Sequence, residues 1–387
     1  MALLVSRTAV FGGEVPLRPA WVDIDLDVIH NNAAVLRETF APAELCAVVK
    51  ADGYGHGAVP VAKAALAGGA TWLAVALVEE GRELRMAGIS EPILVLSQPP
   101  ASAMAAVAQH DLTLTVYSPE AIVAANNAAR EHGKTINVHL KVNTGMNRVG
   151  APVQAAVQLA QAIAESDSLV LQGVFTHFAV ADEPQNGFTA EQAERFAAVV
   201  ESLAAVGLNP PLVHSSNSAA GLLAKHLGQS LVRCGIALYG IPPSAEVALP
   251  EGVRPAMSVR AQVSYVYEAD AGDTVSYGRR YTLKERTTLA VLPVGYADGL
   301  PRQLSNRGSV LIRGEHLPIA GTVTMDQVAI DCGPGSPVQV GDEAVLLGAQ
   351  GGNQITADDW GEEAGTIGYD IVCRIGPRLP RRYLSST

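Results

Sequence analysis

Short apolar runs recur along the first two thirds of the chain, and polar or amphipathic segments separate them. Each run is four to eight residues long and mostly apolar, which is typical of strands buried on both faces. Parallel strands in α/β proteins have this character because helices cover both sides of the sheet. The runs predict eight strands, at residues 45–49, 72–77, 92–97, 112–117, 136–142, 169–176, 211–215 and 231–234.

Segments of helical period lie between these runs, most clearly at 118–133, 151–166 and 189–207. Eight strands that alternate with helices predict a (β/α)8 barrel of the TIM type. A doubly wound open sheet is the competing arrangement, and the count of eight favours the barrel. The expected helix caps are Ser118 and Thr189 at N-termini and Gly133 and Gly207 at C-terminal stops.

The pattern changes near Pro242-Pro243. From about residue 255, strand-like runs are separated by short turns rich in Gly, Pro and Asp, without a long helix between them. We therefore predict two domains, a barrel over 1–248 and a mostly-β domain over 249–387. The first 26 residues, which include a half-exposed strand pattern, are expected to pack with the β domain.

The composition limits the partners and the compartment. The 387 residues carry a net charge of −11, which argues against nucleic acid or an anionic membrane as a partner. The four cysteines contain no C-x-x-C pair, and Cys46 and Cys234 lie in apolar runs, as buried thiols of a reducing compartment do. The sequence lacks a signal-peptide pattern at its start and a lipid-spanning run, so a cytoplasmic location is expected.

Lys50 stands at the end of the first predicted barrel strand, in LCAVVKADGYGHG (45–57). Reactive groups of such barrels gather at the carboxyl ends of the strands. A lysine that is partly desolvated there loses proton affinity, so it can attack an aldehyde or act as a base. For the lysine alone, a solvated side chain at a strand end is the simpler interpretation.

The loops after strands seven and eight, HSSNSAA (214–220) and VRCGIALYG (232–240), lie where such barrels often bind phosphate. Backbone amides at helix starts can face an anion there, although two ordinary helix caps would have the same sequence. The groups expected at this site are one of Ser216, Asn217 and Ser218, together with the amides of Gly235 and Ile236.

Four basic side chains are also expected near these strand ends. Lys141 lies on the fifth strand and Arg148 in the loop after it, while His177 ends the sixth strand and Arg233 lies on the eighth. Buried cations need partners, so packing alone explains such a group poorly. A phosphate site combined with Lys50 suggests pyridoxal phosphate. No nucleotide-binding fingerprint or metal-ligand spacing competes with this interpretation.

Eight motifs in a fixed order carry a resemblance that covers nearly the whole chain: AVVKADGYGHG, KVNTGMNRVG, HSSNSAA, VRCGIALYG, VSYGRRY, GYADG, TMDQ and GYDIVCRIGPR. In these motifs the chain resembles the alanine racemase family of pyridoxal-phosphate enzymes. The resemblance implies a barrel with a C-terminal β domain, and interconversion of L- and D-alanine that supplies D-alanine for peptidoglycan.

The resemblance implies two catalytic residues. Lys50 would form the Schiff base with the cofactor and move the α-proton on one face of the substrate, and Tyr277 would do so on the other face. Inversion of a carbon centre requires a base on each face. In this family the tyrosine comes from the partner subunit, so a homodimer with shared active sites is expected.

Further roles are implied in the same way. Arg233 would contact the pyridine nitrogen with support from His177. Lys141 corresponds to a lysine that is carbamylated in many members. The phosphate ligands would be Tyr54, Ser218, Gly235, Ile236 and Tyr369; the substrate contacts Arg148 and the partner's Met325; and the entrance residues Tyr296 and Tyr369.

The chain departs from the family pattern at Asn143, where the family often has Asp, and at Thr322, where it frequently has Arg.

Three alternatives stay open: a broader-specificity small amino-acid racemase, a related barrel-type decarboxylase, and a non-catalytic cofactor-binding barrel. The decarboxylases place an acid opposite the pyridine nitrogen, so Arg233 argues against them. The physiological role could be cell-wall supply, alanine breakdown or self-protection in a producer of an inhibitor. The sequence suggests no role for His56 beyond shaping its loop.

Overall fold

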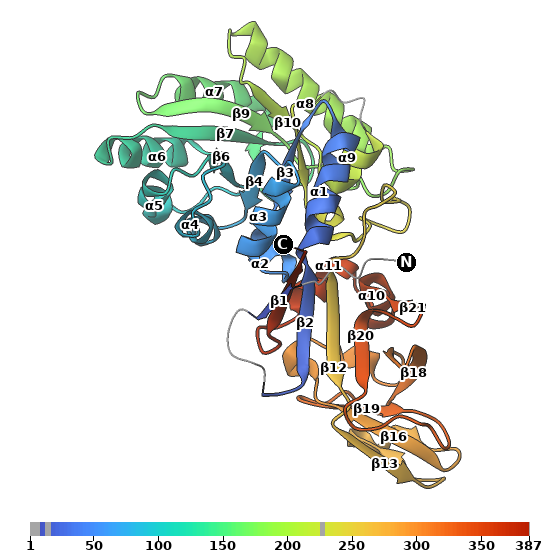
Figure 1. Ribbon diagram of the computed structural model, residues 1–387. Coiled ribbons are helices and arrows are strands. Elements are labelled where there is room, and N and C mark those ends of the chain that lie inside the picture. The colour runs from blue at the N-terminus through green and yellow to red at the C-terminus, as the bar shows by residue number, and fades with distance from the viewer. Residues whose placement is uncertain (1–7, 12–16, 225–228, 387) are drawn as a thin grey trace, which may run out of the picture. The chain divides into compact units, whose positions relative to one another are not determined.

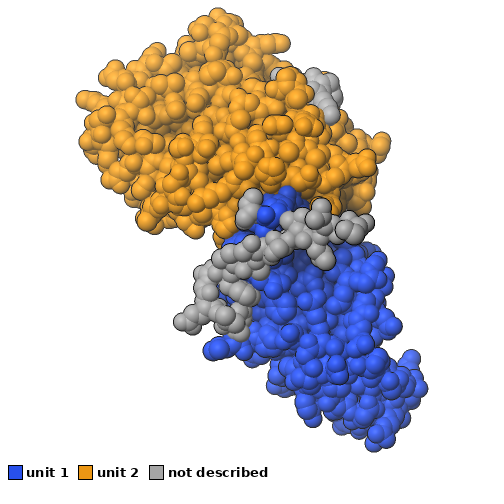
Figure 2. Space-filling view, viewed as in Figure 1, with its two compact units in different colours: residues 1–28, 54–57, 255–387 blue, residues 29–53, 58–254 orange. Residues whose placement is uncertain are grey.

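The computed structural model describes residues 8–11, 17–224 and 229–386. The chain forms two compact units, which Figure 2 shows in different colours. The barrel unit comprises residues 29–53 and 58–254, and the β unit comprises residues 1–28, 54–57 and 255–387.

Eight parallel strands form the centre of the barrel unit, in two sheets of order β11-β3-β4-β5 and β10-β9-β7-β6. A parallel bridge between Leu94 and Thr113 joins one pair of edges. At the other pair, Ser230 N donates to Val213 O at 3.1 Å and Arg233 N donates to Ser216 O at 3.1 Å. The sheets therefore close into a barrel, as predicted. The strands are β3 (Glu44–Val48), β4 (Trp72–Val75), β5 (Ile93–Val95), β6 (Leu114–Val116), β7 (Ile136–Asn143), β9 (Leu169–Phe175), β10 (Leu212–His214) and β11 (Leu231–Cys234).

Helices lie outside these strands, as Figure 1 shows for α4 to α7. Their buried residues recur at helical spacing, for example Leu159, Ala160 and Ile163 in α7. The helices are α1 (Leu26–Phe40), α3 (Ala58–Ala67), α4 (Val78–Met86), α5 (Met104–Gln109), α6 (Pro119–Glu131), α7 (Ala156–Ala164), α8 (Phe188–Ala205) and α9 (Ser218–Leu223), with single 3-10 turns η1 (Ala101–Ala103), η2 (Val153–Ala155) and η4 (Ile236–Tyr239).

Three of the four predicted caps are confirmed. Ser118 accepts a hydrogen bond from Ala121 N at 3.4 Å, and the helix stops Gly133 and Gly207 have φ of 60° and 80°. The prediction for Thr189 is wrong, because α8 begins one residue earlier, at Phe188. Asn186 Oδ1 accepts a hydrogen bond from Phe188 N at 3.1 Å.

The predicted helix at 151–166 also begins later than expected. Ala151–Pro152 forms the short strand β8, which pairs with β7, and η2 precedes α7. Proline cannot donate a ladder hydrogen bond, so a two-residue edge strand accommodates Pro152.

The β unit is built on a long, mostly antiparallel sheet of order β1-β22-β2-β12-β20-β17-β18-β19-β16-β13. Strands β2, β12 and β20 lie side by side in it (Figure 1). Two short helices, α10 (Ala357–Ala364) and α11 (Gly368–Arg374), accompany the sheet. The strands are β1 (Thr8–Phe11), β2 (Ala20–Asp25), β12 (Met257–Gln262), β13 (Tyr265–Ala269), β14 (Thr274–Val275), β15 (Tyr281–Thr282), β16 (Thr287–Leu292), β17 (Ser309–Ile312), β18 (Glu315–Ala320), β19 (Val328–Asp331), β20 (Glu343–Gln350), β21 (Asn353–Ile355) and β22 (Arg381–Ser385), with 3-10 turns η5 (Tyr277–Arg279), η6 (Tyr296–Asp298) and η7 (Arg302–Leu304).

In the part of the chain that the structure describes, no helix is both long enough and apolar enough to cross a membrane.

Candidate active site

Lys50 lies one residue beyond β3, after Val49, and begins the single turn α2 (Lys50–Tyr54). This turn is left-handed, with φ of 53°, 52° and 59° at Ala51, Asp52 and Gly53. Left-handed backbone costs an L-residue roughly 1–2 kcal/mol, so the turn needs support from its surroundings. Ala51 N donates to Glu80 Oε1 at 2.7 Å, and Asp52 Oδ1 accepts from Ala58 N at 2.8 Å. These bonds hold the backbone immediately after Lys50 in one conformation.

Tyr54 and the glycines after it belong to the β unit. The ring of Tyr54 lies 6.4 Å from that of Tyr369, tilted by 50°. The buried His56 donates from Nδ1 to Tyr54 O at 2.9 Å, which agrees with a role in shaping the loop. A Cβ atom on Gly55 would lie 2.4 Å from the carbonyl oxygen of Val372, so the backbone approaches α11 too closely for any other residue.

The loops after β10 and β11 are tied together at Ser218. Of the three residues that the sequence left open, Asn217 is the N-cap of α9, since its side chain accepts from Ala220 N at 3.0 Å. Ser218 is the first helical residue, and its Oγ accepts from Gly235 N at 3.0 Å. The serine hydroxyl and the backbone at Gly235, two groups expected at the anion site, are therefore in direct contact.

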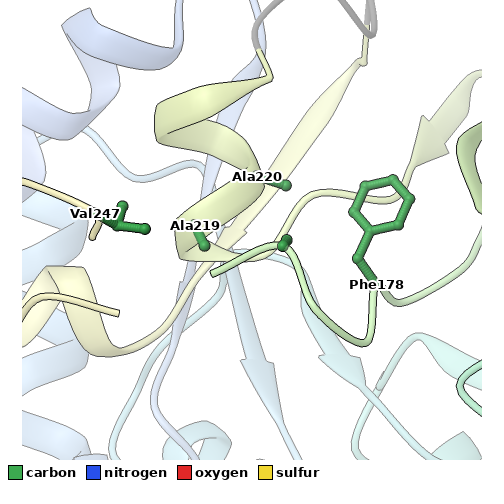
Figure 3. Close-up of a cluster of buried hydrophobic side chains, with 5 residues drawn as sticks. Phe178, Ala219, Ala220 and Val247 are labelled. Carbon is green, nitrogen blue, oxygen red and sulfur yellow. The ribbon is translucent and has the colours of Figure 1, made fainter. Parts of the chain in front are cut away.

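A small hydrophobic cluster joins the start of helix α9 to the loop that follows β9. It contains Phe178, Ala181, Ala219, Ala220 and Val247, all buried. Figure 3 shows Ala219 and Ala220 on helix α9 and Phe178 on the loop that follows β9. Ala219 comes directly after Ser218, and Phe178 comes directly after His177, which lies in the loop that follows β9. Packing of this cluster therefore holds both loops at the carboxyl ends of their strands.

Arg233 is 3% exposed, and its guanidinium is held from several sides. Its Nη2 donates to Thr176 O at 2.8 Å, to Ser215 O at 2.9 Å and to His177 Nδ1 at 3.2 Å. Its Nη1 lies 2.7 Å from His214 Nδ1. Burial lowers the pKa of Arg233 only to about 10, so the side chain stays charged at neutral pH.

These contacts fix the protonation of two histidines. A guanidinium can only donate, so Nδ1 of His177 and Nδ1 of His214 must each present a lone pair. Burial, and then the charge of Arg233, lower the pKa of both imidazoles well below 6.5. Both rings are therefore neutral, with their proton on Nε2.

The chain of hydrogen bonds continues to His139, which the sequence analysis missed together with His214. The Nε2 proton of His214 is donated to His139 Nδ1 at 2.9 Å, and burial lowers the pKa of His139 to about 3. Phe175 stacks on His214, with ring centroids 4.8 Å apart and planes 4° apart. The available sequence signal was a histidine within each of two otherwise apolar strands.

Lys141 is 6% exposed, and its Nζ lies 5.4 Å from the centroid of the Phe175 ring. Its pKa is lowered to about 7, first by burial and then by the charges of Arg233, Arg148 and Lys50. The same three positive charges, with that of Lys141, act on His177. The predicted cations are thus gathered in one region of the barrel unit, and a ligand with anionic groups would offset their mutual repulsion.

The β unit carries the other predicted site residues. Tyr277 begins η5 and is 75% exposed, and Met325 is 52% exposed. Tyr296 N donates to Thr324 O at 2.9 Å and Ala297 N donates to Met325 O at 3.1 Å, which brings the GYADG and TMDQ turns together. Tyr296 and Met325 therefore lie on neighbouring turns of the same unit.

Comparison with known families supports the predicted identity. The family model for the alanine racemase N-terminal domain matches residues 24–243, and the model for the alanine racemase C-terminal domain matches residues 256–383. The chain belongs to the alanine racemase family.

Individual alanine racemases match over nearly the whole chain. The enzyme of Symbiobacterium thermophilum is 46% identical over 371 residues, which cover 96% of this chain and 98% of that protein. The crystal structure of alanine racemase from D-cycloserine producing Streptomyces lavendulae is 40% identical, with a TM-score of 0.92 over 96% of this chain and 98% of that one. The structure from Bacillus anthracis with bound L-Ala-P is 38% identical, with a TM-score of 0.90 over 96% of each chain.

Alanine racemases are pyridoxal-phosphate enzymes, and the barrel unit has a donor set that fits this cofactor. Lys50 supplies an amine at a strand end, Ser218 a hydroxyl at the anion site, and Arg233 a buried donor that keeps its proton. The gathered positive charges suit a phosphate and a carboxylate. The predicted site residues in the barrel unit are Lys50, Lys141, Arg148, His177, Ser218, Arg233, Gly235 and Ile236, and those in the β unit are Tyr54, Tyr277, Tyr296, Met325 and Tyr369.

Proposed function

We propose that the protein interconverts L- and D-alanine, with pyridoxal phosphate held in the barrel unit and with Lys50 and Tyr277 as the two proton-transfer groups. The match to alanine racemases across both domain models carries this proposal. The positive charges of Arg233, Arg148 and Lys50, which act on Lys141 and His177, support it, because the cofactor phosphate and the substrate carboxylate are both anionic.

When bound, pyridoxal phosphate withdraws electrons from the substrate's α-carbon and so weakens its C–H bond. Lys50 Nζ would hold the cofactor until the substrate amine displaces it, and the freed Nζ would then accept or return the α-proton on one face. Tyr277 Oη does the same on the opposite face, since inversion requires a proton-transfer group on each side. In either reaction direction, one of the two groups, Lys50 Nζ or Tyr277 Oη, would remove the α-proton and the other would return a proton on the opposite face.

The remaining site residues bind and orient. Ser218, Gly235, Ile236, Tyr54 and Tyr369 would hold the phosphate. Arg233 would face the pyridine nitrogen, with His177 and His214 fixing its guanidinium. Because an arginine does not give up its proton, this contact would leave the pyridine nitrogen unprotonated and so would discourage side reactions such as transamination.

Arg148 would bind the substrate carboxylate, with the partner subunit contributing Met325. Lys141, whose pKa is lowered to about 7, has a neutral amine available at physiological pH. A neutral amine is the form that can react with carbon dioxide, so we propose Lys141 as a site of carbamylation. Tyr296 and Tyr369 would narrow the entrance.

We further propose a cytoplasmic homodimer with shared active sites that supplies D-alanine for peptidoglycan. Tyr277 and Met325 are exposed on the β unit, which supports a contribution of both side chains to the active site of the partner subunit. A catalytic tyrosine that served only its own chain would be expected to be enclosed by that chain. The buried free thiols Cys46, Cys234 and Cys332 support a reducing compartment.

A chiral assay across several amino acids tests the proposal. The purified protein with added pyridoxal phosphate should convert either enantiomer of alanine into a mixture of both, and Lys50→Ala should not. Borohydride treatment should fix the cofactor on Lys50, as peptide mass spectrometry would detect. Equal turnover of larger amino acids would favour a broad-specificity racemase, and no D-alanine from L-alanine would refute the proposed function.

A further inference from the structure

Ser276, the residue before Tyr277, has an unusual backbone conformation. Its φ is 64° and its ψ is −172°, a combination that is essentially restricted to glycine. A serine persists there only when the surrounding structure holds it, and such residues cluster at functional sites. The position of Tyr277 therefore depends on whatever holds Ser276.

Two hydrogen bonds with Thr322 hold the backbone at Ser276 and Tyr277. Ser276 Oγ donates to Thr322 O at 2.6 Å, and Thr322 Oγ1 donates to Tyr277 O at 2.8 Å. Thr322 is 5% exposed, and both bonds are partly buried. Thr322 contributes both its carbonyl, which accepts from the Ser276 hydroxyl, and its hydroxyl, which donates to the Tyr277 carbonyl, so it binds the chain on both sides of the peptide bond between Ser276 and Tyr277.

The segment that carries Thr322 is itself fixed. Gly321 packs so closely that a Cβ atom there would lie 2.5 Å from Val275 O. Asn306 Oδ1 accepts from Gly321 N at 2.6 Å, while its Nδ2 donates to Arg280 O at 3.0 Å. Asn306 thus ties the far end of the Tyr277 turn to the same segment.

We propose that Thr322 is a positioning residue that sets the place of the Tyr277 phenol through the Tyr277 carbonyl. The phenol ring gains little support from its own unit, because Tyr277 is 75% exposed, so its direction is set largely by its backbone. This inference rests on the proposed function, in which Tyr277 Oη moves a proton. A displacement of about 1 Å at a reacting group can lower a rate about 100-fold.

The test compares Thr322→Val with Thr322→Ser in the cofactor-loaded enzyme. Valine keeps the shape but removes the donor to Tyr277 O, whereas serine keeps the donor. Thr288→Val is the matched control: Thr288 is buried in the same unit, 3% exposed, and its Oγ1 donates to Glu268 Oε1 at 2.6 Å instead. For Thr322→Val we expect kcat to fall about 10- to 100-fold while KM changes less than about twofold. Thr322→Ser and Thr288→Val should have rates near that of the wild type.

Two further readouts separate positioning from general damage. If the Tyr277 step becomes slower, the isotope effect of α-deuterated alanine should rise in the reaction direction in which Tyr277 removes the proton and fall in the other. Amide hydrogen exchange in peptides covering 275–281 should be faster in Thr322→Val than in Thr322→Ser or Thr288→Val.

The outcomes are distinguishable. An inactive wild-type protein would refute the proposed function. If the wild type is active and Thr322→Val has the same kcat, or a kcat lowered only as much as in Thr288→Val, the role of Thr322 is overturned. The proposed function would stand in that case. If Thr322→Val does not fold, Ser276→Ala provides a second test, because it removes the hydrogen bond from Ser276 Oγ to Thr322 O. This variant should show the same rise of the isotope effect in one reaction direction and the same fall in the other. A normal rate in Ser276→Ala would overturn the inference.

Discussion

Arg233 Nη1 lies 2.7 Å from Nδ1 of His214, and this contact determines which nitrogen of a buried imidazole carries the proton. The arginine must donate, so His214 accepts at Nδ1 and donates at Nε2 to His139. The charged guanidinium of Arg233 is thus held by neutral imidazole rings in the barrel core. Because both rings are neutral, they accept hydrogen bonds from the guanidinium and orient it without forming an ion pair with it.

Replacement of His214 by Phe should destabilise the barrel unit. Phenylalanine preserves the stacking on Phe175 but leaves Arg233 without its acceptor at Nη1. Loss of a buried partner of this kind should lower the free energy of unfolding by about 1–3 kcal/mol. Urea denaturation measures this, with His316→Phe, at an exposed histidine, as the control expected to change little. Equal stability of wild type and His214→Phe would contradict the contact.

The lowered pKa of Lys141 predicts a stability that rises with pH. The unfolded lysine binds its proton up to about pH 10.5, whereas the folded one releases it near pH 7. Between these values the unfolded state binds more protons, so the free energy of unfolding should increase with pH by up to about 1.4 kcal/mol per unit, and this gain is lost as pH falls toward 7. Comparison of wild type with Lys141→Met in urea at pH 7 and pH 9 isolates the effect. A difference between the two proteins that does not change with pH would contradict it.

Much of the fold could be predicted because its strands are buried on both faces. Each of the eight apolar runs overlaps a strand of the barrel, and the caps at Ser118, Gly133 and Gly207 follow from local chemistry. The prediction for Thr189 failed because α8 begins at Phe188, with Gly187 at the N-cap position and with Asn186 Oδ1 accepting from Phe188 N. Propensity alone does not choose among several candidate caps within a few residues.

The candidate site was less predictable where long-range contacts override local preference. Ala51 and Asp52 lie in left-handed backbone that their residue types disfavour, and the hydrogen bond from Ala51 N to Glu80, 29 positions away, supports them. His139 and His214 meet only because the strands between them bring them together, so neither stood out as a site residue. The resemblance assigned roles to particular motif residues, but it assigned none to His214, which contacts Arg233, or to His139 behind it.

Removal of the Ser218 hydroxyl should weaken cofactor binding. Ser218 Oγ accepts from Gly235 N, and we propose that it also donates to the phosphate. Loss of a hydrogen bond to a charged group, about 1.5–3 kcal/mol, would raise the Kd for pyridoxal phosphate about 10- to 100-fold in Ser218→Ala. Absorbance titration of the cofactor-free protein measures this value. Ser202→Ala, which removes an exposed hydroxyl bonded to Ala198 O, serves as the control, and equal affinities in both variants would argue against a phosphate at Ser218.

The shared active site predicts complementation between inactive chains. In a hybrid of Lys50→Ala and Tyr277→Phe subunits, one site lacks both groups and the other has both. Random exchange at equal amounts should therefore restore about a quarter of wild-type activity. Lys50→Ala mixed with the double variant should restore none. Hybrids isolated through two affinity tags that remain inactive would show that the two residues do not meet across subunits.

The central claim is that Lys50 and Tyr277 move the α-proton of alanine on opposite faces, and racemisation in heavy water tests it most directly. L-Alanine incubated with the loaded enzyme in D2O should yield D-alanine that carries deuterium at the α-carbon, resolved by chiral chromatography and mass spectrometry. D-Alanine should give deuterated L-alanine in the same way, and Lys50→Ala and Tyr277→Phe should each abolish the inversion. Inversion at the wild-type rate in either variant, or no labelled D-alanine from the wild-type protein, would contradict the two-base account.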